Sequence, residues 1–111
     1  MKYTSSLKKN SDFHRVYRKG KSAVRSCLVV YARRNRSAEN RLGFTVTAKV
    51  GKAHTRNHVR RRLREIYRLH EPELQAGFDL VVVARVRAAE VTYTRLESEF
   101  LSACTELGAA L

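Results

Sequence analysis

The sequence predicts an α+β sandwich, in which helices pack on a sheet. Apolar side chains recur at the spacing of a helix face in three segments, near residues 11–20, 55–70 and 92–107. Runs rich in β-branched and aromatic residues, which are typical of strands, lie between these segments. The elements are therefore expected in the order α-β-β-β-α-β-α, with helices packed on a four-stranded sheet.

The first helix is expected to begin at Ser11 or Asp12, whose side-chain oxygens can cap free N–H groups. Gly20 is expected to end it. Its apolar positions are spaced by three and four residues: Phe13, Val16 and Tyr17. These signals predict a short helix.

The next segments predict strands, a short one at Ser22–Val24 and a longer one at Cys27–Arg33. A polar turn at residues 35–40 separates the longer strand from a third one, Arg41–Val50. Because a short polar turn joins them, these two strands are expected to pair antiparallel as a hairpin.

The second half of the chain predicts a long helix, a buried strand and a closing helix. Thr55 is expected to cap the long helix, which must stop near Glu71 because Pro72 disfavours helical backbone before it. Phe78–Arg87 is too continuously apolar for an edge strand and predicts a central one. The apolar spacing within Thr92–Leu107 predicts the closing helix. Strand, long helix and strand in succession indicate a parallel crossover, which the general rule would make right-handed.

Length and composition predict one domain spanning residues 1–111. A chain of 111 residues, 43% of them hydrophobic, sustains one core but not two. The sequence has neither a membrane-spanning apolar run nor the apolar stretch of a signal peptide near its start, so we expect a cytoplasmic protein without a membrane partner. Cys27 and Cys104 lack metal-ligand spacing and are expected to be buried thiols.

The positive charge is concentrated in the first two-thirds of the chain. Residues 1–70 hold 20 Lys and Arg against three acids, a net charge of +17, whereas residues 71–111 hold three against seven, a net of −4. This uneven distribution is typical of a protein that binds a polyanion. RNA, DNA and an anionic membrane surface are the candidates.

The long helix divides into an apolar and a cationic face. At about 100° per residue, the apolar face combines Val59, Leu63, Ile66 and His70. The opposite arc combines Asn57, Arg60, Arg61, Arg64 and Arg68. The planar guanidinium group of arginine can donate two parallel hydrogen bonds to phosphate oxygens. Glu65 is the only acid between Arg56 and Arg68 that could pair with these arginines. The arc therefore predicts phosphate binding. The alternative, a solvent-exposed face stabilised by ion pairs along the helix, would need more acidic residues than this segment has.

Two further features support binding of RNA, the first through phosphate in general and the second through the bases of a single strand. Lys49 and Lys52 flank Gly51 at the start of the long helix, where free N–H groups also favour an anion. Phe13, Tyr17 and Tyr31 lie among basic residues, and bases stack on such rings. Phe13 and Tyr17 are equally suited to the core face of their helix, so that alternative stays open. Tyr31 shares a strand face with Arg33, which favours an exposed role for it.

Catalytic patterns are missing from the sequence. The four histidines form no HExxH or Cys/His pairing, and no acidic cluster suits a two-metal site. His54 and His58 have the spacing to share a metal on a helix, although contact with phosphates is favoured. Any reaction that the protein serves is expected to be carried out by something else.

Several segments together resemble a known family. These are Arg41-Leu42-Gly43-Phe44-Thr45-Val46, the turn Lys49-Val50-Gly51-Lys52-Ala53 and the helix start Arg56-Asn57-His58-Val59-Arg60-Arg61-Arg62-Leu63-Arg64-Glu65. Together with stretches in residues 7–17 and 78–84, they resemble the bacterial ribonuclease P protein subunit over most of the chain. The departures include His58 in place of an arginine and Ala48 in place of a lysine.

The resemblance implies a ribonucleoprotein in which a large catalytic RNA binds Mg²⁺ and removes the 5′ leader from precursor tRNA. This chain would be its non-catalytic protein subunit, with the catalytic ribonuclease P RNA and precursor tRNA as partners and no cofactor of its own. The RNA-facing residues would be Arg56, Asn57, Arg60, Arg61 and Arg64. The leader would lie in a cleft lined by Phe13, Tyr17 and Tyr31. The resemblance also implies a left-handed βαβ crossover, which is rare.

Two other functions stay open at this point. A ribosomal-protein-like RNA chaperone shares the charge and the α+β layout but has no role in cleavage. A nuclease acting alone would need an acid/base pair, which the sequence does not offer.

Overall fold

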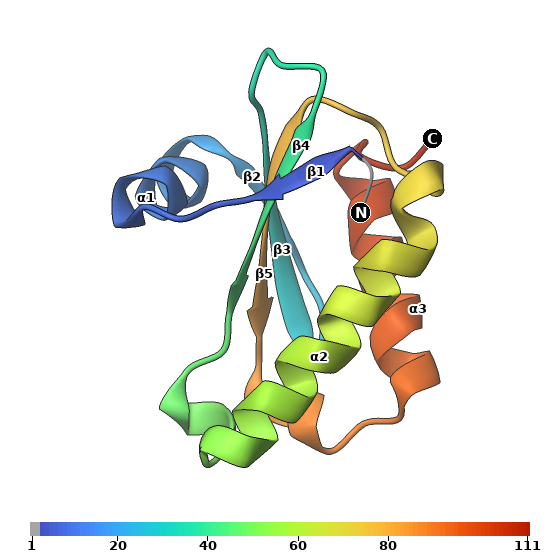
Figure 1. Cartoon of the computed structure of the whole chain (residues 1–111). Helices are drawn as coiled ribbons and strands as arrows, with labels where there is room; N and C mark the ends of the chain where they lie inside the picture. Colours follow the sequence, from blue (N-terminus) through green and yellow to red (C-terminus); the bar gives the residue numbers. More distant parts are fainter. Residues whose placement is uncertain (1–2) are drawn as a thin grey trace.

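The computed structural model describes residues 3–111 and contains three layers. The sheet lies in the middle (Figure 1), with α1 (Asn10–Lys19) on one face and α2 (Ala53–His70) and α3 (Tyr93–Glu106) on the other. The predicted α+β sandwich is confirmed, with its helices divided between the two faces. None of the helices described is long and apolar enough to span a membrane.

The sheet has five strands in the order β1-β4-β5-β3-β2. Their bounds are β1 Thr4–Ser6, β2 Lys21–Val24, β3 Leu28–Arg34, β4 Asn40–Thr45 and β5 Phe78–Ala84. β5 pairs parallel with β4 and antiparallel with β3. The predicted central position of β5 is confirmed, and all of its residues except Val83 are buried.

The predicted hairpin between the second and third expected strands is wrong. β3 and β4 are antiparallel to each other, but β5 lies between them and bonds to both. The reason is burial: β5 is apolar on both faces, so the centre of the sheet suits it better than an edge. β4 also ends earlier than expected, because residues 48–50 form a 3-10 turn that points Val50 into the core.

The sequence also missed β1, so the sheet has five strands rather than four. β1 is a Thr-Ser-Ser segment that pairs parallel with the start of β4. The sequence shows no strand signal here, because the segment is too short and polar to show alternating apolar residues. Tertiary contacts hold it in place. The hydroxyl groups of Thr4 and Tyr67 are hydrogen-bonded at 2.7 Å, and the backbone N–H of Tyr3 donates to Glu71 Oε2 at 3.2 Å.

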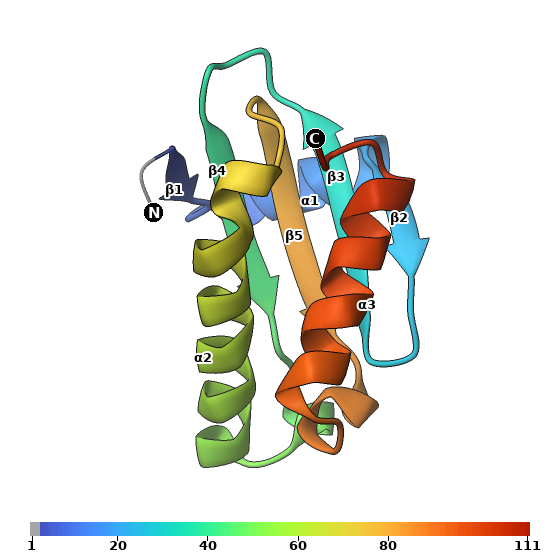
Figure 2. The same ribbon diagram turned by 90° about the vertical axis from the view of Figure 1, so that its right-hand side faces the viewer.

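The β4-α2-β5 crossover is left-handed. Figure 2 views the sheet from the side of α2 and α3; β4 and β5 run downward, α2 returns upward in front, and β5 lies to the right of β4. A right-handed connection would place β5 to the left. The handedness implied by the resemblance is confirmed, and the general rule fails here. A right-handed path between the same strands would place α2 on the face that α1 occupies.

Two helix starts differ from the prediction. α1 begins at Asn10 and α2 at Ala53, one and two residues before the expected caps, and neither has a side-chain cap bond. Gly51 determines the start of α2 instead. Its φ of 154° excludes most other residues, and an added Cβ would lie 2.9 Å from Thr55 Cγ2. Gly20 as the end of α1 and His70 as the end of α2 agree with the prediction.

The core has one part on each face of the sheet. The larger part lies under α2 and α3 and includes the predicted Val59, Leu63 and Ile66, together with the free thiols Cys27 and Cys104. The smaller part lies under α1, where Leu7, Val16 and Val81 are packed against partly buried aromatic rings. α2 therefore presents its opposite face to solvent.

His70, expected on the apolar face of α2, is half-buried between two carboxylates. It contacts Glu73, and its Nε2 lies 2.7 Å from Glu97 Oε2. The hydrogen bond with Glu97 raises the pKa of His70, and that with Glu73 adds to this, although burial opposes both. The protonated ring thus links the end of α2 to α3.

We expect His70 to make the free energy of unfolding depend on pH. Because its pKa is higher in the folded chain, its stabilisation is complete below about pH 6.5 and is lost as the pH rises through the raised pKa. His70→Gln should remove this dependence and cost less than about 1 kcal/mol under acidic conditions. Urea unfolding of both proteins across this range measures it. Identical pH profiles would contradict the assignment.

Candidate nucleic-acid interface

The outer side of α2 carries the predicted cationic arc. Asn57, Arg61 and Arg64 are exposed, and Arg60 is half-buried. A guanidinium N–H of Arg60 donates to Asn57 Oδ1 at 3.2 Å, which orients both side chains along the helix. Among the described residues, no carboxylate pairs with Arg60, Arg61 or Arg64, so the expectation of an unquenched arc is confirmed for these three.

Arg68 differs from the other arginines of the arc. Its Nε and Nη2 donate to the two carboxylate oxygens of Glu65 at 3.1 and 2.6 Å. The hydrogen bond from Arg68 lowers the pKa of Glu65. The one acid of this helix segment therefore neutralises Arg68, the last member of the arc.

The remaining predicted RNA-binding residues lie at the start of α2. Lys49 and Lys52 are exposed beside the Gly51 turn. Arg56 is half-buried rather than on the open arc, and its buried Nε has no hydrogen-bond partner among the described residues. A hollow of about 600 Å³ lies alongside, lined by His54, Thr55, Asn57, His58, Arg61 and Ala89. The start of α2 thus combines cations, polar side chains and an unsatisfied donor.

His54 and His58 both line this hollow, as helical spacing requires. In the part of the chain that the structure describes, no three His, Cys, Asp or Glu side chains are grouped to hold a metal ion. Among the described residues, His54 and His58 therefore have no third side chain beside them with which to hold a metal ion.

A second hollow, of about 300 Å³, lies between α1 and β4. It is lined by Asn10, Phe13, His14, Tyr17, Phe44 and Thr45. The hydroxyl groups of Tyr17 and Thr45 are hydrogen-bonded at 2.7 Å, which fixes Tyr17 against the strand. Phe13 lies directly over Gly43, where an added Cβ would come within 2.5 Å of its ring. Two of the three predicted cleft residues thus line a real depression.

Tyr31 takes a supporting position. Its ring meets that of Tyr17 edge-on, with centroids 5.0 Å apart and planes at 77°, and it is partly buried in the core under α1. The sequence favoured an exposed role for Tyr31 and left Phe13 undecided between core and surface. Phe13 has both roles, because it packs on the core under α1 and also lines the hollow.

Sequence reasoning missed four residues of this hollow: Asn10, His14, Phe44 and Thr45. Phe44 and Thr45 lie within the motif that carried the resemblance, next to Gly43, and that motif was the available signal. Asn10 and His14 gave none, because a single polar residue on a short helix has no pattern of its own.

Taken together, these surfaces define a class of protein: a small basic α+β protein that carries a free cationic arc on one helix and, separately, an aromatic hollow. The family model Ribonuclease P matches residues 1–108. The ribonuclease P protein component of Natranaerobius thermophilus is 45% identical over 95 residues, which are 86% of this chain and 83% of the relative. That of Clostridioides difficile is 44% identical, over 85% and 83%.

Solved structures agree. The ribonuclease P protein of Staphylococcus aureus superposes with a TM-score of 0.87 at 32% identity, covering 96% of this chain and 97% of the other. That of Thermotoga maritima gives 0.81 at 33% identity, covering 88% and 93%. The chain belongs to the ribonuclease P protein family.

Proposed function

We propose that this chain is the protein subunit of a ribonuclease P ribonucleoprotein. It binds the catalytic RNA and the 5′ leader of precursor tRNA, and so promotes endonucleolytic removal of the leader. The observation that carries the proposal is the presence of two distinct surfaces in a chain of this family. One is a free cationic arc on α2, and the other is an aromatic hollow between α1 and β4.

The α2 surface is suited to an RNA backbone. Arg60, Arg61 and Arg64 extend over more than one helical turn, and their planar forks match phosphate oxygens. Lys49, Lys52 and the N-terminal end of α2 add positive potential at one end. A phosphate oxygen near Arg56 would satisfy its buried Nε. Arg68 would join the contact only by leaving Glu65.

The hollow beside α1 is suited to an unpaired nucleotide of the leader. Its rings, Phe13, Tyr17 and Phe44, provide apolar surface for a base, while Asn10 and His14 provide polar edges. Tyr31 supports Tyr17 from behind. Sequence-tolerant stacking of this kind suits leaders that differ between tRNAs.

The proposed role in catalysis is indirect. Mg²⁺ bound by the RNA subunit would supply the metal-ion chemistry of phosphodiester cleavage. The protein's arginines would neutralise RNA phosphates and replace condensed counterions, so that the ribonucleoprotein works at lower Mg²⁺ concentration. The carboxylate nearest in sequence to the arc, Glu65, is bonded to Arg68.

Cleavage of precursor tRNA by a bacterial ribonuclease P RNA tests the proposal. At a Mg²⁺ concentration too low for the RNA alone, adding the protein should restore cleavage at the mature 5′ end. The protein without the RNA should cleave nothing. Unchanged cleavage on addition of the protein would contradict the subunit role and leave a general RNA-binding module.

Tyr17 should contribute to leader binding through its ring. We expect Tyr17→Ala to weaken binding of precursor tRNA to the holoenzyme by on the order of 1 kcal/mol, and to leave binding of mature tRNA unchanged. Tyr17→Phe is the matched control, since it keeps the ring and loses only the hydrogen bond to Thr45. Filter binding of both tRNA forms measures the difference. Equal loss for mature tRNA would contradict contact with the leader.

A further inference from the structure

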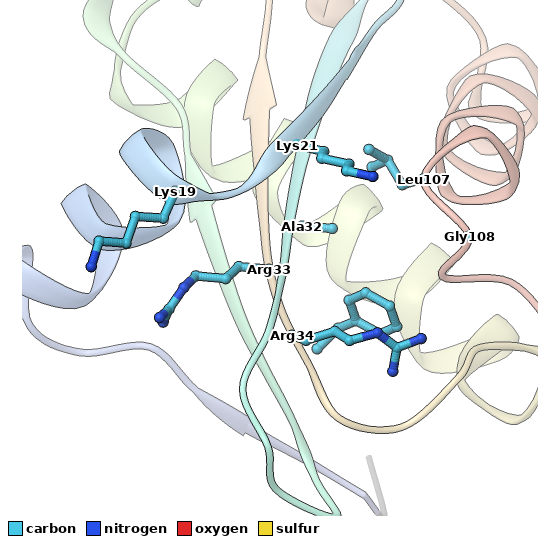
Figure 3. A pocket seen from close by; sticks show the side chains of 8 residues that line it. Lys19, Lys21, Ala32, Arg33, Arg34, Leu107 and Gly108 are labelled. Carbon is cyan, nitrogen blue, oxygen red and sulfur yellow. The ribbon is translucent and has the colours of Figure 1, made fainter.

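A third hollow lies at the corner where β2 and β3 meet the ends of α1 and α3. Its volume is about 350 Å³, and four cations line it: Lys19, Lys21, Arg33 and Arg34. Figure 3 shows Lys19 and Arg33 on one side of the sheet edge and Lys21 and Arg34 on the other. A neighbouring depression, lined by residues 33–36, adds Arg36. We call these five side chains the corner cluster.

Within residues 3–111, the charges of the corner cluster are not paired. None of its five side chains forms an ion pair with any residue that the structure describes. Asp79, the buried acid paired with Arg33 across the strands, is bonded to Arg41 and Asn35 instead. Arg34 lies over the ring of Phe78, 4.9 Å from its centroid, which orients it without neutralising it.

In the described part of the chain, the corner cluster shares this lack of ion pairs with Arg60, Arg61 and Arg64 of α2, although other arginines are paired. Arg25, Arg41, Arg68 and Arg95 each hold a carboxylate. Five neighbouring cations without one repel each other, which destabilises the folded state unless an anion neutralises them. Because adjacent strand residues point to opposite faces, the cations extend around the sheet edge. An extended polyanion fits this shape better than a single small anion.

The corner cluster is separate from both surfaces already described. It lies at the end of β3, which runs antiparallel to β4, whereas α2 begins beyond the opposite end of the sheet. In Figure 2 the start of α2 is at the lower left, and β3 ends at the upper right. The aromatic hollow is lined by α1 residues from Asn10 to Tyr17 together with β4, whereas Lys19, the last residue of α1, lines the corner instead.

We propose that the corner cluster is a second phosphate-binding surface, which holds the backbone of an RNA segment without reading its sequence. The α2 arc and the corner cluster then bind two segments at once, and the protein bridges them. The segments belong either to one RNA or to two. This inference does not depend on tRNA processing, so its first two tests use RNA that contains no tRNA.

Salt dependence of RNA binding provides the first test. The probe is a short RNA duplex of arbitrary sequence without single-stranded ends. Lys21→Ala/Arg34→Ala should lower the slope of log affinity against log salt by roughly 1.4 to 1.8, which is 0.7 to 0.9 for each lost phosphate contact. The charge-conserving variant Lys21→Arg/Arg34→Lys should keep the slope. An unchanged slope in the alanine variant would overturn the proposal.

Bridging provides the second test. One duplex is immobilised and a second, labelled duplex is offered together with the protein below saturation. The wild-type protein should retain the labelled duplex, while Lys21→Ala/Arg34→Ala and Arg61→Ala/Arg64→Ala should each lose it and still bind the immobilised one. Retention by the corner variant at the wild-type level would overturn the bridging role. Circular dichroism confirms that each variant is folded.

A photo-crosslinker identifies the RNA in the assembled holoenzyme. Burial raises the pKa of Cys27 and of Cys104 to about 12, so neither thiol competes for a thiol-reactive label. Ser22→Cys places a single exposed thiol next to Lys21 and keeps all five cations. Crosslinks to the catalytic RNA or to precursor tRNA would name the segment that is held. Absence of any RNA crosslink would contradict the proposal.

Discussion

Arg41→Ala should lower the free energy of unfolding by about 3 kcal/mol. Arg41 Nε donates to Asp79 Oδ1 at 2.9 Å and Nη2 to Oδ2 at 2.6 Å, and Asp79 is 1% exposed. Burial alone would raise the pKa of Asp79, but the hydrogen bonds from Arg41 and Asn35 hold it below its usual value. Removing Arg41 leaves a buried carboxylate with one partner, Asn35. Breaking such a pair is strongly destabilising, moderated here because Arg41 is one-third exposed.

The pH dependence and a control distinguish this effect from loss of packing. In the variant the pKa of Asp79 should rise, so that mild acid protonates the carboxyl and returns part of the lost stability. The double variant Arg41→Ala/Asp79→Asn should also regain part of the lost free energy of unfolding at neutral pH. Arg18→Ala, at an exposed arginine of α1, should change stability by less than about 0.5 kcal/mol. Urea unfolding measures all four proteins, and equal effects of Arg41→Ala and Arg18→Ala would contradict the role of the pair.

Arg41 also connects the fold to the aromatic hollow. Its Nη1 lies 3.7 Å from Asp12 in the first turn of α1, which carries Phe13 into the hollow. The same arginine thus holds β4, β5 and α1 together. A folded Arg41→Ala protein should therefore bind precursor tRNA less selectively over mature tRNA, although it removes no ring.

Arg60→Ala/Arg64→Ala should weaken binding of the catalytic RNA and lower the salt slope by roughly 1.4 to 1.8, at 0.7 to 0.9 for each arginine. The matched control is Arg62→Ala on the same helix, because Arg62 points to the other side. It donates to the carbonyl of Val91 at 3.1 Å and lies over the ring of Tyr93. Arg62→Ala should leave the slope unchanged. A slope that falls equally for Arg62→Ala would contradict the arc as the interface.

Periodicity predicted the parts of the fold that depend on neighbours along the chain. The buried face of α2 and the central place of β5 follow from spacing and from a continuous apolar run, and both are confirmed. Strand order is different, because it depends on which distant segments compete for the centre of the sheet. For that reason the expected hairpin fails, and the short polar β1 gives no signal at all.

The candidate site shows the same division. Helical spacing alone placed Asn57, Arg60, Arg61 and Arg64 on one surface. It did not show that Arg68 is neutralised by Glu65, because that depends on rotamers. The sequence also did not indicate the corner cluster. Lys19 and Lys21 are brought close to residues 33–36 only by the pairing of β2 with β3.

The ratio of holoenzyme affinities for precursor and mature tRNA, measured at saturating protein, tests most directly the separation of the α2 arc from the aromatic hollow. The wild-type protein should favour precursor tRNA. The Arg60→Ala/Arg64→Ala variant should saturate the catalytic RNA only at a higher protein concentration but keep the affinity ratio. The Tyr17→Ala variant should lower the affinity ratio and saturate the RNA at the wild-type concentration. A wild-type ratio of one, or a ratio that falls for the arginine variant and not for Tyr17→Ala, would contradict these roles.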